Sequence, residues 1–222
     1  MSSERAKKPR VACVFCNGTL DSPERAKRAA SHCDLLLAAD GGMRHLAALN
    51  LEPEALVGDM DSVRPGPWSR QGRIVQIPHP PDKGRSDTEI AVEYAFQQGC
   101  DQVVLVAATG GRLDHTLANV ALAAHYPGRV AIFSGSATLV AVDRSEKCVL
   151  NGLVGTTVSL IPYGPDRQCI RTTGLKYSLG DEALPNATRG LSNELVETHG
   201  CVCVSEGILL VYIESGESCP TP

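Results

Sequence analysis

From residue 11 to residue 142, short apolar runs alternate with segments of helical character. The apolar runs predict buried strands over residues 11–16, 35–39, 55–57, 73–77, 103–107 and 130–133. The segments between them predict helices over residues 25–31, 43–49, 88–98 and 113–125. Strands that alternate with helices predict a mainly parallel sheet covered by helices.

The pattern of apolar residues changes after residue 142. Short β-branched runs separated by glycine and proline cover residues 138–142, 147–150, 157–162, 168–172 and 207–214. No segment among them has a convincing helical period, which is typical of a small all-β sandwich or partial barrel. The sequence therefore predicts an α/β domain over residues 11–142 and a β-sandwich domain over residues 143–216.

Composition excludes several classes of protein. The chain has 222 residues, of which 43% are hydrophobic and 21% charged, as in ordinary globular proteins. A net charge of −4 gives no general attraction to nucleic acid or to anionic membranes. No apolar stretch approaches the roughly 20 residues that span a bilayer, and the charged start lacks the apolar core of a signal peptide. We expect a cytoplasmic protein that binds neither nucleic acid nor membrane.

Nine cysteines are a high count for such a protein. Cys13 and Cys16 lie in the first predicted strand, where their spacing points the two thiols to opposite faces. Cys201 and Cys203 are alternate residues. Without a secretory signal, a disulfide framework is not expected. Structural thiols are favoured over a zinc or redox site, because unpaired cysteine commonly behaves as a small hydrophobic residue.

Two aspartates, Asp59 and Asp61, follow the third predicted strand within residues 58–62, Gly-Asp-Met-Asp-Ser. In an extended chain their side chains point the same way, so both carboxylates can share one cation. Gly58 allows backbone or ligand to approach closely. Hard oxygen donors that supply few protein ligands suit Mg²⁺. The alternative is a polar turn, since glycine and aspartate are also turn residues.

A second acidic cluster opens the third predicted helix. Ser86 and Glu89 match the capping-box pattern of a serine N-cap followed three residues later by glutamate, so Glu89 is assigned to capping. Asp87 falls in the first turn, where the helix dipole favours an acid, and the neighbouring carboxylate clusters make it a candidate metal ligand. Lys83 and Arg85 lie just upstream and would either contact phosphates or form a solvated loop.

Two glycine pairs each connect a predicted strand to a predicted helix. Gly110 and Gly111 precede Arg112, so free backbone N–H groups and a guanidinium are available to bind phosphate. Residues 40–42, Asp-Gly-Gly, form a similar junction after the second predicted strand. Neither junction is a Walker loop or a dinucleotide fingerprint. Ligands of open α/β sheets bind at the carboxyl ends of the strands, so these positions predict a magnesium–polyphosphate site.

Together the clusters resemble the thiamine pyrophosphokinase family, also called thiamine diphosphokinases. The α/β part matches the family at four segments, residues 40–42, 58–62, 83–89 and 110–115. The β part matches it at residues 174–177, Gly-Leu-Lys-Tyr, and at 192–193, Ser-Asn. Order and spacing agree from about residue 11 to residue 214, which is nearly the whole chain.

The resemblance implies that the pyrophosphoryl group of ATP is transferred to the hydroxyl of thiamine, giving thiamine diphosphate and AMP. It implies a homodimer with thiamine at the subunit interface. Mg²⁺ would be bound by Asp59, Asp61 and Asp87. The catalytic residues would be Asp59, Asp61, Asp87, Arg112 and Asp114. ATP and its phosphates would be contacted by Asp40, Gly41, Gly42, Lys83, Gly110, Gly111, Arg112 and His115. Thiamine would be contacted by Tyr177, Ser192 and Asn193.

Some points stay open. Gly84 stands where many relatives have an acid, and Ser178 stands where proline is common. His115 is either a phosphate-site residue or a capping or orienting histidine, and the group that takes the hydroxyl proton is an aspartate or His115. A metal-dependent phosphohydrolase and a sensor without turnover are the rival functions. Tyr177 favours the transferase, since a hydrolase does not need an aromatic platform for an acceptor.

Overall fold

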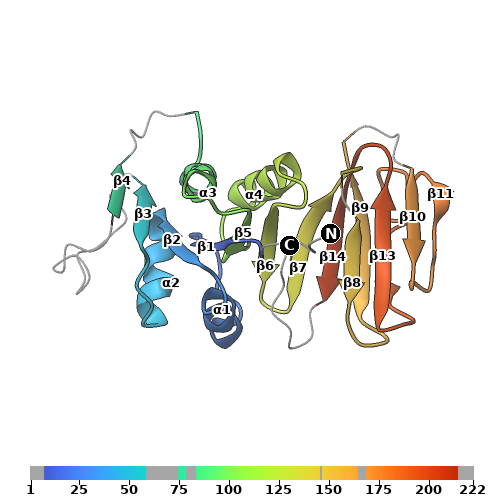
Figure 1. The fold of residues 1–222 in the computed structure, drawn as a ribbon, viewed down its shortest axis with the longest axis horizontal. Helices are drawn as coiled ribbons and strands as arrows, with labels where there is room; N and C mark the ends of the chain where they lie inside the picture. The colour runs from blue at the N-terminus through green and yellow to red at the C-terminus, as the bar shows by residue number, and fades with distance from the viewer. Residues whose placement is uncertain (1–7, 59–74, 79–83, 146, 165–168, 215–222) are drawn as a thin grey trace, which may run out of the picture.

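The computed structural model describes residues 8–58, 75–78, 84–145, 147–164 and 169–214 (Figure 1). The strands of its first part are β1 (Val11–Phe15), β2 (Leu35–Ala39), β3 (Ala55–Gly58), β4 (Val75–Pro78), β5 (Gln102–Val106) and β6 (Val130–Ser134). The helical segments are α1 (Pro23–Ala30), η1 (Asp40–Gly42), α2 (Met43–Ala48), α3 (Asp87–Gln97) and α4 (Leu113–His125). The later strands are β7 (Ala137–Val142), β8 (Cys148–Asn151), β9 (Thr157–Tyr163), β10 (Ile170–Thr173), β11 (Gly180–Glu182), β12 (Asn193–Glu194), β13 (His199–Val204) and β14 (Ile208–Glu214).

Six strands form the parallel part of the larger sheet. β1 pairs with β2 on one side and with β5 on the other. The chain moves outward from β1 through β2 and β3 to β4, then returns to β5 and continues to β6. The direction of winding therefore reverses between β1 and β5, which is the point where open α/β sheets bind ligands. The predicted mainly parallel sheet is confirmed.

Helices cover both faces of this sheet, and β1 shows why. Its alternate residues Val11, Cys13 and Phe15 pack in a core with α1 and α2. Ala12 and Val14 pack in a second core with α3 and α4. All five side chains are buried, as expected for a central strand with a helix layer on each side. In Figure 1, α3 and α4 lie above the sheet and α1 and α2 below it.

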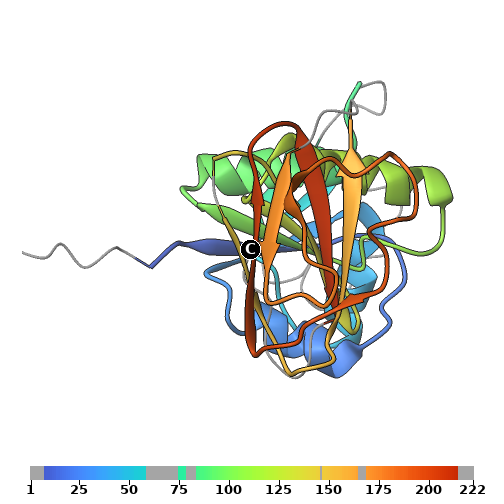
Figure 2. The same ribbon diagram turned by 90° about the vertical axis from the view of Figure 1, so that its right-hand side faces the viewer.

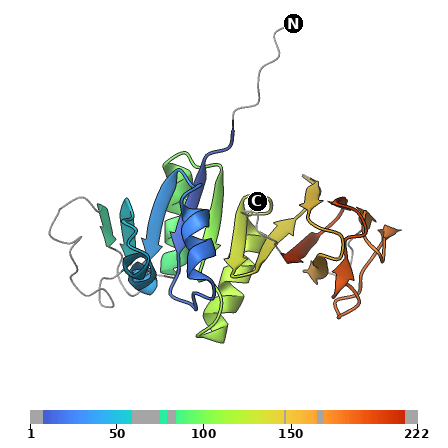
Figure 3. The ribbon, with the colours of Figure 1, turned by 90° about the horizontal axis from the view of Figure 1, so that it is seen from below.

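The β part is joined to the same sheet. β7 pairs antiparallel with β6 and with β14, and β9 and β12 extend the sheet to its edge. β11, β10, β13 and β8 form a separate antiparallel sheet, which faces the viewer in Figure 2. The two sheets share one core, to which the larger contributes Leu160 and Leu209 and the smaller Leu150 and Ile170. The predicted sandwich is confirmed, and its larger sheet is continuous with the α/β sheet (Figure 3).

Most element bounds agree with the pattern within two residues, but three strands were missed. β11 and β12 are only three and two residues long, too short to leave a pattern. β13 alternates buried Gly200, Val202 and Val204 with half-buried cysteines, so its period of two is hidden by residues that are not polar. Cys13 and Cys16 lie in different cores, as their spacing predicts. Among the described residues, no helix is long and apolar enough to cross a membrane.

Candidate functional site

The carboxyl ends of four parallel strands bring the sequence-predicted clusters to one edge of the sheet. β1 leads into Asn17 and Gly18, β2 into residues 40–42, and β5 into residues 107–111. β3 ends at Gly58, and Asp59 and Asp61 beyond it lie outside the described residues, as does Lys83. The edge includes the reversal between β1 and β5, so its position is that of a ligand site in this class of sheet.

The loops after β1 and β5 interlock at that reversal. The amide of Gly18 donates to Ala107 O at 2.8 Å, and the amide of Thr19 donates to Thr109 O at 2.8 Å. A Cβ added to Gly18 would lie 2.3 Å from Thr109 O. Gly110 has φ +77°, and its added Cβ would lie 2.2 Å from Thr19 Oγ1. Both positions therefore require glycine for close packing.

Gly111 differs from its neighbour. It also has a left-handed backbone, with φ +67°, but a Cβ added there would meet no atom within 4 Å. The residue is exposed. Gly110 thus serves the fit between two loops, whereas Gly111 borders open space in which a ligand can approach the backbone.

Among the described carboxylates of the edge, Asp40 is held in an unusual backbone conformation. It has φ +46°, an unusual angle for a residue with a side chain. Its Oδ2 accepts a hydrogen bond from Asn17 Nδ2 at 3.2 Å. Its Oδ1 is buried and has no hydrogen-bond partner among the described residues. A buried carboxylate oxygen without a partner is costly, so this atom suits a cation or a ligand donor.

Two basic residues that the sequence reasoning missed bind the loop after β1. Arg44 donates to Asn17 O at 3.1 Å and to Gly18 O at 3.3 Å. His45 Nε2 lies 2.9 Å from Gly18 O, and because a carbonyl only accepts, Nε2 carries the proton. Burial lowers the pKa of His45, which favours the neutral ring. Both side chains fasten the β1 loop from α2, and no motif in the sequence signals them.

The start of α3 is anchored to the same edge. Ser86 Oγ accepts a hydrogen bond from the Glu89 amide at 3.2 Å, which confirms the predicted serine cap. Thr88 Oγ1 lies 3.7 Å from Cys16 Sγ, directly after β1, and so places Asp87 in the first turn near the end of that strand. Burial raises the pKa of the Cys16 thiol to about 12, so it stays neutral. Arg85 is paired with Glu93 at 2.5 Å.

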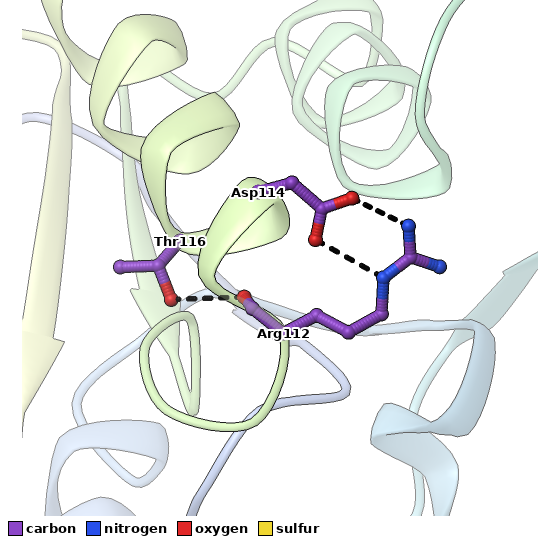
Figure 4. Close-up of polar contacts among 3 residues, drawn as sticks. All are labelled: Arg112, Asp114 and Thr116. Carbon is purple, nitrogen blue, oxygen red and sulfur yellow. Dashed lines mark hydrogen bonds and ion pairs between the residues drawn. The ribbon is translucent and has the colours of Figure 1, made fainter.

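Arg112 and Asp114 form a two-point ion pair at the start of α4 (Figure 4). Arg112 Nε and Nη2 donate to the two carboxylate oxygens at 3.1 and 2.5 Å. The hydrogen bond from Arg112 lowers the pKa of Asp114 to about 2, and the pKa of Arg112 is raised in return. Both side chains are exposed. His115 is exposed as well, and a hydrogen bond from its backbone also lowers the pKa of Asp114.

The residues matched to thiamine lie in the β part of the chain. Tyr177 is on the connection between β10 and β11 and is 63% exposed. Asn193 is buried, and its amide binds both sides of the Tyr177 backbone, accepting from N at 3.0 Å and donating to O at 2.9 Å. Ser192 has φ +56°, and its amide donates to Ser159 Oγ at 3.1 Å. Asn193 therefore holds the Tyr177 loop, and its contact with a ligand stays a prediction.

A complete metal site is not visible in the described part of the chain. Among those residues, no three His, Cys, Asp or Glu side chains are grouped closely enough to hold an ion. Asp59 and Asp61 fall outside that part, so the predicted ligand set is not tested. The unpartnered Oδ1 of Asp40 and the carboxylate of Asp87 in the first turn of α3 are oxygen donors of the kind that Mg²⁺ prefers.

Known proteins match the chain along most of its length. The family model described as "Thiamin pyrophosphokinase, catalytic domain" matches residues 26–134. The model described as "Thiamin pyrophosphokinase, vitamin B1 binding domain" matches residues 139–209. The thiamine pyrophosphokinase of Bacillus subtilis is 25% identical over 185 residues, covering 80% of this chain and 86% of that protein. Thiamine pyrophosphokinase 1 of Arabidopsis thaliana is 27% identical over 201 residues, covering 78% of this chain and 74% of that protein.

Solved structures agree with these matches. The crystal structure of the Bacillus subtilis enzyme has a TM-score of 0.80 at 21% identity, covering 93% of this chain and 99% of that one. The crystal structure of the thiamin pyrophosphokinase of Geobacillus thermodenitrificans has a TM-score of 0.75 at 25% identity, covering 95% of this chain and 100% of that one. Both family models match in order, one on the helix-covered sheet and one on the sandwich. The chain therefore belongs to the thiamin pyrophosphokinase family.

Proposed function

We propose that the chain transfers the pyrophosphoryl group of ATP to the hydroxyl of thiamine, giving thiamine diphosphate and AMP. The match of both family domains over residues 26–134 and 139–209 carries this conclusion. In the reaction, the hydroxyl oxygen forms a bond to the β-phosphorus of ATP. The bond from that phosphorus to the oxygen of the α-phosphate breaks, and AMP leaves. Such transfers depend on positioning and on neutralising the charge of the transferred group.

We propose that Asp59, Asp61 and Asp87 hold Mg²⁺ at the carboxyl edge of the parallel strands. Bound there, Mg²⁺ would neutralise charge between the carboxylates and the phosphates of ATP, which otherwise repel each other. The unpartnered buried oxygen of Asp40 supports a cation or donor at this edge. Asn17 fixes the other Asp40 oxygen and so keeps the unpartnered one in place.

Phosphate binding is assigned to the glycine junctions and to Arg112. Gly111 borders open space, and free N–H groups at the start of α4 favour an anion. Asp114 positions Arg112 by engaging Nε and one Nη2 hydrogen, which leaves the remaining guanidinium hydrogens for phosphate. Asp40, Gly41, Gly42, Lys83, Gly110 and His115 complete the proposed set around ATP. The proton of the thiamine hydroxyl is assigned to no single residue.

The acceptor site is proposed at Tyr177, Ser192 and Asn193 in a sandwich domain of residues 143–216, with residues 11–142 forming the ATP domain. Tyr177 presents an exposed ring while Asn193 holds its backbone. We propose a homodimer in which this site meets the ATP site of the other subunit. Leu113 and Leu117, 72% and 60% exposed on the first turns of α4, support this arrangement because a partner would cover them.

One assay distinguishes the transferase from its two rivals. The purified chain is incubated with Mg²⁺ and ATP, with and without thiamine, and AMP and thiamine diphosphate are quantified. The transferase forms both products in equal amounts and only with thiamine. Nucleotide hydrolysis without thiamine would identify a phosphohydrolase, and binding of thiamine without any product would identify a sensor. Either result would overturn the proposal.

A further inference from the structure

The outward side of β13 carries two thiols that the proposed reaction does not use. Cys201 and Cys203 are alternate residues, both half-buried, and their Sγ atoms lie 3.6 Å apart. The residues between and beside them, Gly200, Val202 and Val204, are buried. The two sulfurs therefore share the face of the smaller sheet that is turned away from the sandwich core.

Neighbouring strands hold the backbone of this pair in the sheet. Cys201 stands opposite Val149 of β8 and Thr173 of β10. Cys203 stands opposite Arg171 of β10. β10 pairs along both cysteines and β8 reaches as far as Val202, so the backbone that carries the two thiols is held in the sheet.

The spacing of the sulfurs fits one bridging ion. A tetrahedral zinc ion has Zn–S bonds of about 2.3 Å, so two of its thiolates lie roughly 3.8 Å apart. The observed 3.6 Å is close to that value. Thiolate ligands select soft ions such as Zn²⁺ and Cd²⁺, whereas Mg²⁺ prefers oxygen.

A disulfide fits less well. It would require the two sulfurs to close to about 2.05 Å, which the paired backbone of β13 resists. The pKa of the Cys201 thiol is raised, first by burial and then by the neighbouring Cys203 thiol. A protonated thiol attacks oxidants slowly. Lys147 acts in the opposite direction on Cys201 and so favours its thiolate once a metal displaces the proton.

We propose that Cys201 and Cys203 form a two-thiolate site for a thiophilic divalent ion that prefers tetrahedral coordination, of which Zn²⁺ is the common example. Among the described residues there is no group of three His, Cys, Asp or Glu side chains for a metal, so water or an added ligand fills the other positions. The bound ion is exchangeable, since closed structural zinc sites use four protein ligands. This site is independent of the proposed pyrophosphoryl transfer.

The test uses Cd²⁺ alone as the probe, with the reduced full-length chain in buffer without Mg²⁺. Sulfur-to-cadmium charge transfer gives a near-ultraviolet absorbance that reports thiolate ligands only. We expect the absorbance to saturate at one equivalent of Cd²⁺ and to disappear in Cys201→Ser and in Cys203→Ser. Cys33→Ser is the matched control, because Cys33 contacts Cys13 in a second thiol pair on the α1 side of the molecule, and it should retain the full signal.

Excess Zn²⁺ should remove the cadmium absorbance, and excess Mg²⁺ should leave it unchanged. A signal that persists in Cys203→Ser, or no signal in the parent chain, overturns the proposal. Folding of the variants is checked by circular dichroism. A second measurement needs no variant: Cd²⁺ should protect Cys201 and Cys203 from alkylation, as mapped by mass spectrometry. Equal alkylation with and without Cd²⁺ would refute the site.

Discussion

Gly110 and Gly111 offer a matched pair of substitutions that tests how the β1 and β5 loops fit together. Both have left-handed backbone angles, with φ of +77° and +67°. An alanine Cβ at Gly110 would lie 2.2 Å from Thr19 Oγ1 and 2.7 Å from Thr19 Cβ, whereas at Gly111 no atom lies within 4 Å. The two alanine variants therefore differ in packing and share the same backbone cost.

The two variants differ in the expected loss of the free energy of unfolding. A left-handed alanine costs about 1–2 kcal/mol relative to glycine, and restriction of the unfolded chain offsets about 0.4–1 kcal/mol of this. Gly110→Ala adds an overpacking cost of about 1–3 kcal/mol, because Thr19 belongs to a loop tied by backbone hydrogen bonds. We expect Gly111→Ala to lower the free energy of unfolding by about 1 kcal/mol and Gly110→Ala by about 2–4 kcal/mol.

Urea unfolding followed by circular dichroism measures both values. The double variant Thr19→Gly/Gly110→Ala removes the two clashing atoms. A double-mutant cycle should therefore recover at least about 1 kcal/mol of the loss. Equal destabilisation by the two alanines, or no coupling between Thr19 and Gly110, would refute the interlocked arrangement of the loops.

The same pair also tests the phosphate assignment. If ATP occupies the open space beside Gly111, the added methyl of Gly111→Ala will raise the KM for ATP while stability changes little. The main effect of Gly110→Ala should instead be a lower free energy of unfolding. A Gly111→Ala variant with unchanged KM for ATP would remove Gly111 from the phosphate site.

Three further predictions follow from the other contacts. Asn193→Ala removes both hydrogen bonds to the Tyr177 backbone and should raise the KM for thiamine more than the KM for ATP; the reverse order in steady-state kinetics would contradict its positioning role. Arg112 depresses the folded-state pKa of Asp114, so the ion pair is fully present above the unfolded pKa and is lost only as the pH falls through about 2. Asp114→Asn should therefore lower kcat/KM without moving the acid limb of the pH–rate profile, and a shifted limb would refute this. If the site is shared between subunits, mixing refolded Asp87→Asn and Tyr177→Ala chains should restore about a quarter of the parent activity. Half of random dimers are mixed, and each mixed dimer has one intact site out of two. No recovery of activity would place both halves of the site in one subunit.

The fold was largely predictable because its main signals are local. The runs at residues 35–39 and 113–125 predicted β2 and α4 with the observed bounds. Apolar periodicity identifies such elements, since burial on one or two faces determines which residues they contain. The continuity of the α/β sheet into the sandwich was not predictable. It depends on β7 pairing with both β6 and β14, and β14 lies near the other end of the described chain.

The candidate site was predictable only where side chains with evident chemistry occur in short strings. Asp87 and Arg112 stand in such strings, and their positions at helix starts follow from local pattern. Asn17, Arg44 and His45 do not, because their roles depend on contacts between residues more than 20 positions apart. The pairing of Arg112 with Asp114 was also missed, although only one residue separates them. Composition alone does not show which partner an exposed arginine selects.

Asp40 stands in a short string with evident chemistry, but its geometry depends on a contact with Asn17, which is distant in the sequence. Its left-handed backbone and its unpartnered buried Oδ1 are both unfavourable in the free chain. Neighbouring contacts hold it there: Asn17 binds Oδ2, a Cβ at Gly41 would meet the Asn17 side chain at 2.3 Å, and one at Gly42 would meet Phe15 O at 1.9 Å. The two glycines thus allow η1 to approach the end of β1 closely enough to fix the carboxylate before any ligand arrives. A mobile aspartate loses conformational entropy when a ligand orders it, and a carboxylate that is already fixed avoids this cost. The strain therefore favours binding at the edge where we propose that ATP binds.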